Sequence, residues 1–404
     1  MSTTEARLEV STDAIPNEPA PLRQYWARFG SFILTTELDT IADEELHGRL
    51  IDALAADNRV SNIERGSMDP EWTRKYVVYP RASEQLMDDL LSGADHRHTV
   101  RFSGALMFTI NVPVKNQPSI HGTIPASDSY DVAWDGCTAV VIWQRGEERY
   151  PAIAGGQILV EVLRTAAATA GAGLYVQACS PGCQHLFAHA EIKLDEFLSE
   201  KRDLSFGSAG PRPLLLTARG SYSDLELVEA VHDALAVPSG DFARLKNVAR
   251  RLLDIESAAR RMSADLISHD YITLTRSRGN ILQRIGYSLG ELWFTLIGRG
   301  RKHHASVLIA SLWLAMASMD ILQRNFNEIY REFQSSVSRH GSPRLYEIDL
   351  QPDTADVENL EPQFARAAVE HKSARLDNHG VVLATVIGAV GGAILTGVGS
   401  GLLK

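Results

Sequence analysis

The chain of 404 residues ends in a run of 24 uncharged residues, Gly380–Leu403, which Lys404 follows. An uncharged run longer than about 18 residues is typical of a membrane-spanning helix. As an α-helix with a rise of ~1.5 Å per residue, the run would be roughly 36 Å long, and the hydrocarbon core of a bilayer is about 30 Å thick. The sequence therefore predicts a C-terminal transmembrane anchor over residues 379–404.

Glycines within this run have the spacing of packed membrane helices. At about 100° per residue, Gly388, Gly392 and Gly399 fall within roughly 40° of one another on a helix. Small residues at such positions let a second helix approach closely. We therefore expect a homo-oligomer whose anchors pack through these glycines. The alternatives are a solitary anchor and a tail folded back onto the protein.

The charges that flank the run predict its orientation. Arg366, Lys372 and Arg375 precede it, and only Lys404 follows. The positive-inside rule then places the body of the chain in the cytoplasm. The N-terminal residues lack a basic start followed by an apolar stretch, so no secretory signal is expected. Three cysteines also fit a reducing compartment.

Charge is spread unevenly along the chain. Residues 240–304 contain twelve Lys and Arg and six Asp and Glu, a net charge of +6, whereas the whole chain is −10, so the remainder is −16. The acidic total argues against a general nucleic-acid binder. The basic segment predicts a surface that faces phosphates, of a lipid or of a nucleotide. The alternative is a solvated helix face whose charges are paired locally.

We expect an α/β N-terminal part, with a mixed sheet and at least one βαβ unit, then an α-helical region and the C-terminal transmembrane helix. The boundaries inferred from composition are a disordered tail at 1–22, an α/β ligand-binding or catalytic domain at 23–237, a helical domain at 238–340, a linker and helix at 341–378, and the anchor at 379–404. Within the helical domain, Ala305–Met319 is uncharged. That run is short for a membrane span, so a buried core helix is favoured.

Periodicity predicts the individual elements. Strands are expected at Ser31–Glu37, Arg59–Glu64, Lys75–Tyr79, His98–Val114 and Pro213–Ala218, and helices at Thr40–Ala56, Glu84–Leu91 and Ser223–Ala236.

One stretch has the pattern of a βαβ unit. Cys137–Trp143 is typical of a buried strand, Gln157–Ala170 of a helix, and Leu174–Ala178 of a second strand, which predicts a crossover between parallel strands. Ligands of such sheets bind outside the carboxyl ends of the strands. Here those ends are Gln144–Gly156 and Cys179–Gly182.

The next stretch, Gln184–Leu194, alternates between apolar and polar residues, which predicts a strand. The residues expected to be buried are Leu186, Ala188, Ala190, Ile192 and Leu194. On the opposite face, Glu191 and Lys193 form a Glu-x-Lys pair, with His189 beside them. A carboxylate that holds Mg²⁺ next to a lysine that contacts a phosphate is typical of metal-dependent nucleases. Such a site needs an acid on a neighbouring strand, and Asp131 and Asp135 are the candidates; an ordinary exposed strand face is the alternative.

Two further candidates for phosphate binding lie at helix starts. Gly155, Gly156 and Gln157 open the crossover helix, where free backbone N–H groups attract anions. The loop matches no nucleotide fingerprint, so a plain tight turn is the alternative. Arg299, Arg301 and Lys302 form a cationic helix start suited to a phosphate or a lipid headgroup.

A metal site is not predicted. Cys179, Cys183, His185 and His189 are potential zinc ligands, but their spacing matches none of the strong zinc patterns. On a strand, His185 and His189 would be about 13 Å apart, too far to share an ion. A turn between two strands with incidental cysteines is therefore favoured, and a zinc site is the alternative. The sequence does not identify a cofactor.

The sequence supports two classes of function. The first is a membrane-anchored cytoplasmic protein that responds to a ligand or signal, an effector that oligomerises and perturbs the membrane in defence. Its partners would be the lipid bilayer, further copies of the chain, and an anionic small molecule or nucleotide. The second is a membrane-attached, metal-dependent phosphodiesterase or nuclease-like enzyme that uses the Glu191 and Lys193 strand. The sequence leaves open whether the protein is an enzyme.

Overall fold

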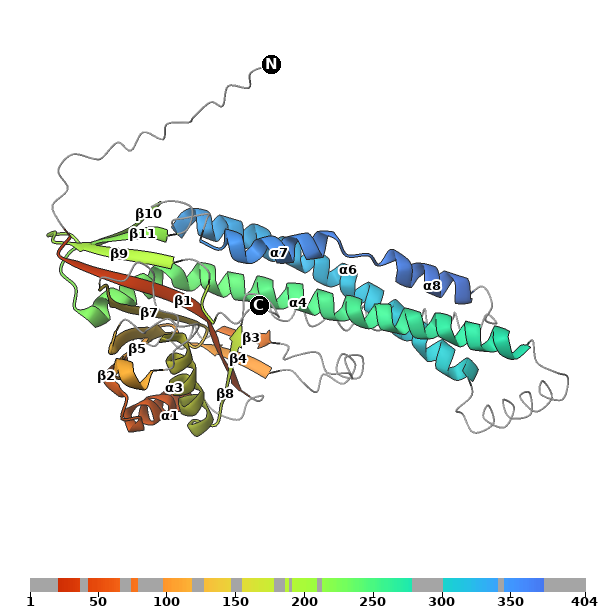
Figure 1. Cartoon of the computed structure of the whole chain (residues 1–404), viewed down its shortest axis with the longest axis horizontal. Coiled ribbons are helices and arrows are strands. Elements are labelled where there is room, and N and C mark those ends of the chain that lie inside the picture. The colour runs from red at the N-terminus through yellow and green to blue at the C-terminus, as the bar shows by residue number, and fades with distance from the viewer. Residues whose placement is uncertain are drawn as a thin grey trace, which may run out of the picture.

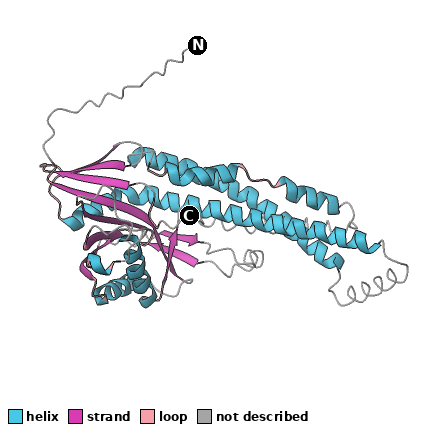
Figure 2. Cartoon of the chain, viewed as in Figure 1, coloured by secondary structure: helices cyan, strands magenta, loops and turns pink. Residues whose placement is uncertain are grey.

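The protein combines a β-sheet with long helices that extend well beyond it (Figures 1 and 2). The computed structural model describes residues 21–36, 43–65, 74–78, 97–117, 127–146, 155–177, 186–188, 191–208, 213–277, 301–340 and 345–373.

The strands of the sheet are β1 (Arg23–Thr36), β2 (Val60–Arg65), β3 (Arg74–Val78), β4 (Arg97–Arg101), β5 (Leu106–Asn111), β6 (Ser129–Trp134), β7 (Thr138–Gln144), β8 (Gly173–Gln177), β9 (Glu191–Phe197), β10 (Asp203–Ser208) and β11 (Pro213–Arg219). The helices are α1 (Asp43–Ala56), α3 (Gly155–Thr169), α4 (Asp224–Ser277), α6 (Arg301–His340), α7 (Glu347–Glu358) and α8 (Gln363–Ser373), with a 3₁₀ turn, η2, at Val114–Asn116.

Strand β1 organises the sheet. It is 14 residues long, and nearly all of it is buried. It pairs antiparallel with β7 and β4 along one edge and with β9 and β8 along the other. The sheet order is β10-β11-β9-β1-β7-β6-β5-β2, and it is mixed because β9 and β11 are parallel. The expected mixed sheet is therefore confirmed.

The expected βαβ unit is only partly correct. Strands β7 and β8, joined by α3, do run in the same direction, but each pairs antiparallel with β1, which lies between them. The unit is thus a split crossover rather than two adjacent parallel strands. The physical reason is that β1 is long enough to pair with β7 over Tyr25–Ser31 and with β8 over Ser31–Thr35.

Most predicted strands and helices are confirmed near their expected positions, and three strands differ in extent, one of them the strand expected at Gln184–Leu194, which is described over Glu191–Phe197. The strand expected at Ser31–Glu37 begins eight residues earlier, because Arg23–Ser31 pairs with β9 and β7. The single run expected at His98–Val114 is split into β4 and β5; between them, the Phe102 N–H donates to the Asp135 carbonyl at 2.7 Å.

Alternate side chains of β1 enter two separate cores. Trp26, Phe32 and Leu34 pack with α1 and α3, whereas Tyr25, Ala27 and Phe29 pack with α4 and the other long helices. Two-sided burial explains why β1 is so apolar on both faces.

Helix α4 begins with a capping box. The Glu226 N–H donates to the Ser223 hydroxyl at 3.2 Å, and the Ser223 N–H donates to the Glu226 carboxylate at 2.8 Å. The helix continues for 54 residues, roughly 80 Å. Helix α6 returns along it, α7 packs on α4, and α8 packs on both α4 and α6 (Figure 1). We call these four helices the stalk.

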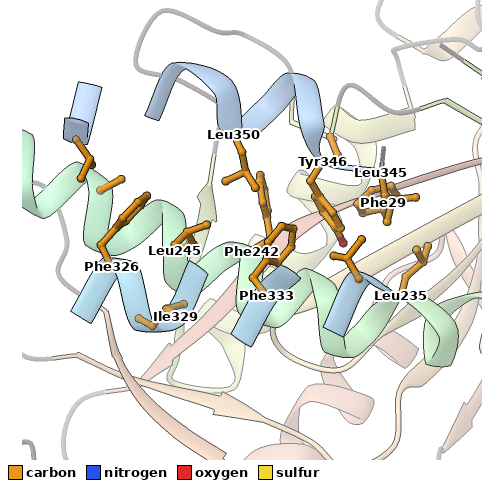
Figure 3. Close-up of a cluster of buried hydrophobic side chains, with 14 of the residues drawn as sticks. Phe29, Leu235, Phe242, Leu245, Phe326, Ile329, Phe333, Leu345, Tyr346 and Leu350 are labelled. Carbon is orange, nitrogen blue, oxygen red and sulfur yellow. The ribbon is translucent and has the colours of Figure 1, made fainter. Parts of the chain in front are cut away.

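The stalk and the sheet share one core. Figure 3 shows Tyr346 between Phe29 of the sheet and Phe242 and Phe333 of the stalk; its ring centroid lies 5.3 Å from those of Phe29 and Phe333 and 4.6 Å from that of Phe242. The boundary expected between residues 237 and 238 lies inside α4, which is continuous there and contains Pro238.

Within the described residues, one helical segment, Ser306–Val337, is long and apolar enough to cross a membrane. In its most apolar window, 39% is buried against the rest of the protein, and a core helix passes the same test. The apolar helix is thus internal in the sequence. The expected C-terminal anchor and its glycines, Gly388, Gly392 and Gly399, lie outside the described residues, as do the helix expected at Glu84–Leu91 and the cysteines at 179 and 183.

Candidate functional site

Strand β9 presents Glu191 and Lys193 on the face predicted for them. Ile192 and Leu194 are fully buried, while Glu191 and Lys193 are half-buried on the opposite side of the sheet. The described strand begins at Glu191. Before it, the Ala188 N–H donates to the Phe29 carbonyl at 2.9 Å. Phe187 is buried and Leu186 is half-buried, so the alternation expected over Gln184–Leu194 does not hold at these two residues. His189 and Ala190 lie outside the described residues.

Two cations lie over the ring of Trp26. The Nζ atom of Lys193 is 5.5 Å from the Trp26 ring centroid, and the Cζ atom of Arg145 is 5.6 Å from it. Trp26 itself is buried, and both cations lie within cation–π range of its ring.

Arg28 is the third cation on this face. It is 4% exposed, and its Nε has no hydrogen-bond partner among the described residues. Its Nη2 lies 3.5 Å from Oε1 of Glu191. Burial lowers the pKa of Arg28, and the Glu191 carboxylate opposes that shift. A buried guanidinium with an unused N–H is costly unless an acceptor satisfies it. We call Arg28, Arg145 and Lys193 the basic cluster.

The start of helix α3 lies on the same side of the sheet. Arg28 and Gly30 are two residues apart on β1 and so share a face. A Cβ at position 30 would lie 3.3 Å from Cα of Phe187, and a Cβ at position 156 would lie 2.7 Å from the Phe187 ring. Glycine at both positions therefore lets the first turn of α3 pack over Phe187.

The first turn of α3 suits an anion. It contains no acidic residue, so its free N–H groups and the helix dipole act unopposed by a local carboxylate. Gly156 is buried and Gln157 is exposed; only the backbone of Gly155 is described. The structure thus places two separately predicted groups, the Glu191 and Lys193 pair and the Gly155–Gln157 turn, on one face of the sheet.

The acids expected to complete a nuclease site are elsewhere. Asp131 of β6 lies opposite Ile142 of β7, which lies opposite Ala27 of β1. Ala27 in turn lies opposite Ile192 of β9. Three strand spacings, about 14 Å, therefore separate Asp131 from β9. Ile142 and Ala27 face the stalk core, which places Asp131 on the side of the sheet opposite Glu191.

Asp131 has its own surroundings. The Thr109 hydroxyl donates to its Oδ1 at 2.8 Å. Burial raises the pKa of Asp131, and the hydrogen bond from Thr109 opposes that shift. Among the described residues, no group of three or more His, Cys, Asp and Glu side chains could hold a metal ion. The structure therefore does not bring Asp131 together with Glu191.

Asp135 instead belongs to a buried junction between the sheet and α4. Its Oδ1 accepts hydrogen bonds from the N–H groups of Cys137 and Thr138, at 2.9 and 2.7 Å. Its Oδ2 accepts a hydrogen bond from Nε–H of Arg101 at 2.6 Å. Nε2 of His232, from α4, lies 3.7 Å from the same Oδ2.

The junction sets the charges of its members. Burial raises the pKa of Asp135, but Arg101 and His232 outweigh burial and leave that pKa well below its usual range. Burial lowers the pKa of His232, but Asp135 and Asp233 outweigh it and raise that pKa to about 9. Sequence reasoning missed His232; the Asp135–Gly136 pair between two strands is the one local signal, and it indicates a hairpin turn.

The cationic helix start is not part of the basic cluster. Arg301 and Lys302 begin α6 at the end of the stalk farthest from the sheet (Figure 1), and Arg299 lies outside the described residues.

Comparison with known protein families, with curated proteins and with solved structures found no match.

Proposed function

We propose that this protein is a membrane-anchored, ligand-responsive effector whose sheet binds a phosphate-bearing small molecule or nucleotide at the basic cluster. The observation that carries the proposal is Arg28, a buried guanidinium on the same face as Lys193 and the start of α3, whose Nε–H has no acceptor within the part of the chain that the structure describes. Phosphate oxygens are the acceptors that a guanidinium and a helix start bind best.

The response would travel through β1. Arg28 faces the basic cluster, and the next residue, Phe29, packs against Tyr346 of the stalk core. A shift of β1 on ligand binding would therefore reach α4 and α7 directly. We propose that the output is association of C-terminal anchors through Gly388, Gly392 and Gly399, which perturbs the bilayer in defence.

The enzyme alternative rests on Glu191 and Lys193, with His189, which lies outside the described residues. Because Asp131 faces the other side of the sheet and Asp135 is buried in the turn between β6 and β7, the described residues do not favour it.

Thermal unfolding of the full chain tests the ligand site. Inorganic phosphate or ATP should raise the Tm more than sodium chloride at equal ionic strength, because only the folded state binds the anion. Arg28→Met should abolish that difference. Arg49→Met is the matched control, since Arg49 is an exposed cation on α1 that pairs with Glu45. A wild-type response equal to that of chloride, or one that survives Arg28→Met, would overturn the ligand proposal.

The anchor is tested separately. Deletion of Gly380–Lys404 should move the protein from the membrane fraction to the soluble fraction. Replacement of Gly388, Gly392 and Gly399 by leucine should preserve membrane targeting, because the segment stays apolar, and abolish oligomerisation. A deletion variant that still sediments with membranes would show that this segment is not the anchor.

A further inference from the structure

The outward face of α6 changes character along its length. Along one side of the helix, at intervals of three to four residues, lie four apolar residues, Val307, Ala310, Trp313 and Ala317, and farther along the same side are the polar residues Asp320, Arg324 and Asn327. Val307 is 47% exposed and Trp313 is 42% exposed, whereas the two alanines are half-buried. The apolar part spans eleven residues, about 15 Å. We call Val307, Ala310, Trp313 and Ala317 the apolar stripe.

The apolar stripe lies at the free end of the stalk. Helix α6 begins there, next to the end of α4 and away from the sheet (Figures 1 and 2). Near the same end of α4, Ile267 is 60% exposed. Three of the six large, exposed hydrophobic side chains among the described residues are thus in this half of the stalk. Surface apolar residues gathered in one place indicate an interaction site.

We propose that the apolar stripe lies on the surface of an anionic lipid bilayer. The opposite face of α6 is buried against α4 through Leu312, Ala315 and Met316, so one stripe is available, and an interfacial rather than a spanning position fits it. Tryptophan is enriched where a membrane meets water.

Charge selects the lipid surface over a second copy of the chain. The part of the basic segment that is nearest to Val307 in the sequence, residues 261–304, contains seven Lys and Arg and three Asp and Glu, a net charge of +4. Anionic headgroups attract such a segment by about 1 kcal/mol per cation near the surface. Self-association through this face would instead bring two segments of like charge together. This contact does not depend on the ligand at Arg28, and it adds a second membrane contact to the predicted anchor.

Site-directed spin labelling of the full chain in vesicles tests the proposal. Cys179 and Cys183 are replaced by serine, and single labels are introduced by V307C and W313C on the apolar stripe and by D320C and R324C farther along the same face. In vesicles that contain phosphatidylserine, labels at 307 and 313 should become several-fold more accessible to oxygen than to an aqueous nickel chelate. Labels at 320 and 324 should remain accessible to nickel.

The other outcomes overturn the proposal. If the label at 313 is as accessible to nickel as the label at 324, the apolar stripe does not meet lipid. Spin–spin broadening at 313 that is independent of lipid would identify a second copy as the occupant. If the labels at 307 and 313 enter neutral phosphatidylcholine vesicles as deeply as anionic ones, charge does not select the lipid surface. Sedimentation of the same samples reports the anchor independently.

Discussion

Nε2 of His232 in α4 lies 3.7 Å from Oδ2 of Asp135, in the turn between β6 and β7, and both side chains are buried. The pair connects the turn between β6 and β7 to α4, two parts of the protein that are not adjacent in the sequence. Arg101 shares the carboxylate, and its guanidinium lies against α4: a Cβ at position 240 would be 2.9 Å from its Nη1. The three side chains therefore hold the hairpin turn in one position relative to α4.

This pair predicts a loss of stability at alkaline pH. The pKa of His232 is raised to about 9 in the folded state, above its ordinary value of 6.5. Its contribution is therefore fully present below pH 6.5 and is lost as the pH rises through 9. The expected loss is on the order of 3 to 4 kcal/mol, since the folded and ordinary pKa values differ by about 2.5 and one pKa unit corresponds to about 1.4 kcal/mol. Urea unfolding from pH 6 to 10 measures it, and His232→Gln should flatten this dependence.

A second histidine predicts the opposite behaviour at acid pH. Burial, and to a smaller extent the charge of Arg65, lower the pKa of His47 to about 4. His47 is thus neutral in the folded state, so its contribution is present above pH 6.5 and is lost as the pH falls through 4. In His47→Gln, the free energy of unfolding should fall less between pH 6.5 and 4 than in the wild type, and its dependence on alkaline pH should be unchanged. An effect of this variant on the alkaline limb would show that the two histidines are coupled.

The sequence could predict features that repeat locally, and it could not predict pairings between distant segments. Alternation placed Ile192 and Leu194 in the core and Glu191 and Lys193 outside it, as the structure confirms. In contrast, β1 separates β7 from β8 because it pairs with strands that follow it by more than 100 residues, and no local periodicity predicts such pairing.

The candidate site was predictable to a similar degree. Glu191, Lys193 and Gly156 could be found from spacing, but their common face depends on how α3 packs over Phe187. Arg28 was missed, although a single charge in the apolar run Tyr25–Leu34 is itself a signal, because a buried charge requires a partner. His232 and Asp135 are 97 residues apart, so their contact had no sequence pattern.

Glycine substitutions should separate backbone strain from helix propensity. Gly136 has a φ of +85°, and a Cβ there would lie 2.4 Å from the Val100 carbonyl oxygen. Gly136→Ala should therefore lower the free energy of unfolding by about 2 kcal/mol or more. Gly48→Ala in α1 is the matched control; no atom lies within 4 Å of its added Cβ, so it should stabilise by about 0.5 to 1 kcal/mol. Urea unfolding measures both, and equal effects would contradict the assignment of strain to Gly136.

Tyr346 should be the most sensitive position of the shared core. It is 1% exposed and contacts rings from β1, α4 and α6. Tyr346→Ala should destabilise by about 3 to 5 kcal/mol through the lost packing and the cavity. Tyr346→Phe keeps the ring and removes only the hydroxyl that pairs with Ser239, so it should cost about 1 to 2 kcal/mol. If both variants cost the same, the hydroxyl rather than the ring carries the contact.

Glu191 should weaken the proposed anion site, because its carboxylate competes with the ligand for Arg28. The carboxylate lies 3.5 Å from the Arg28 guanidinium. Its removal should favour anion binding by roughly 1 kcal/mol or more, at effective dielectric constants between those of water and a protein surface. Glu191→Gln should therefore raise the affinity for inorganic phosphate by about fivefold, as calorimetry measures. Glu161→Gln is the control, because it makes the same change of charge on the exposed surface of α3, beside Arg59.

The enzyme interpretation predicts the reverse. A carboxylate that holds Mg²⁺ is required for activity, so Glu191→Gln would abolish phosphodiester cleavage and would not strengthen phosphate binding. The same variant therefore separates the two functions. Tighter phosphate binding with an unchanged response to Mg²⁺ supports a ligand site at the basic cluster, because only there does Glu191 act as a competitor rather than as a ligand.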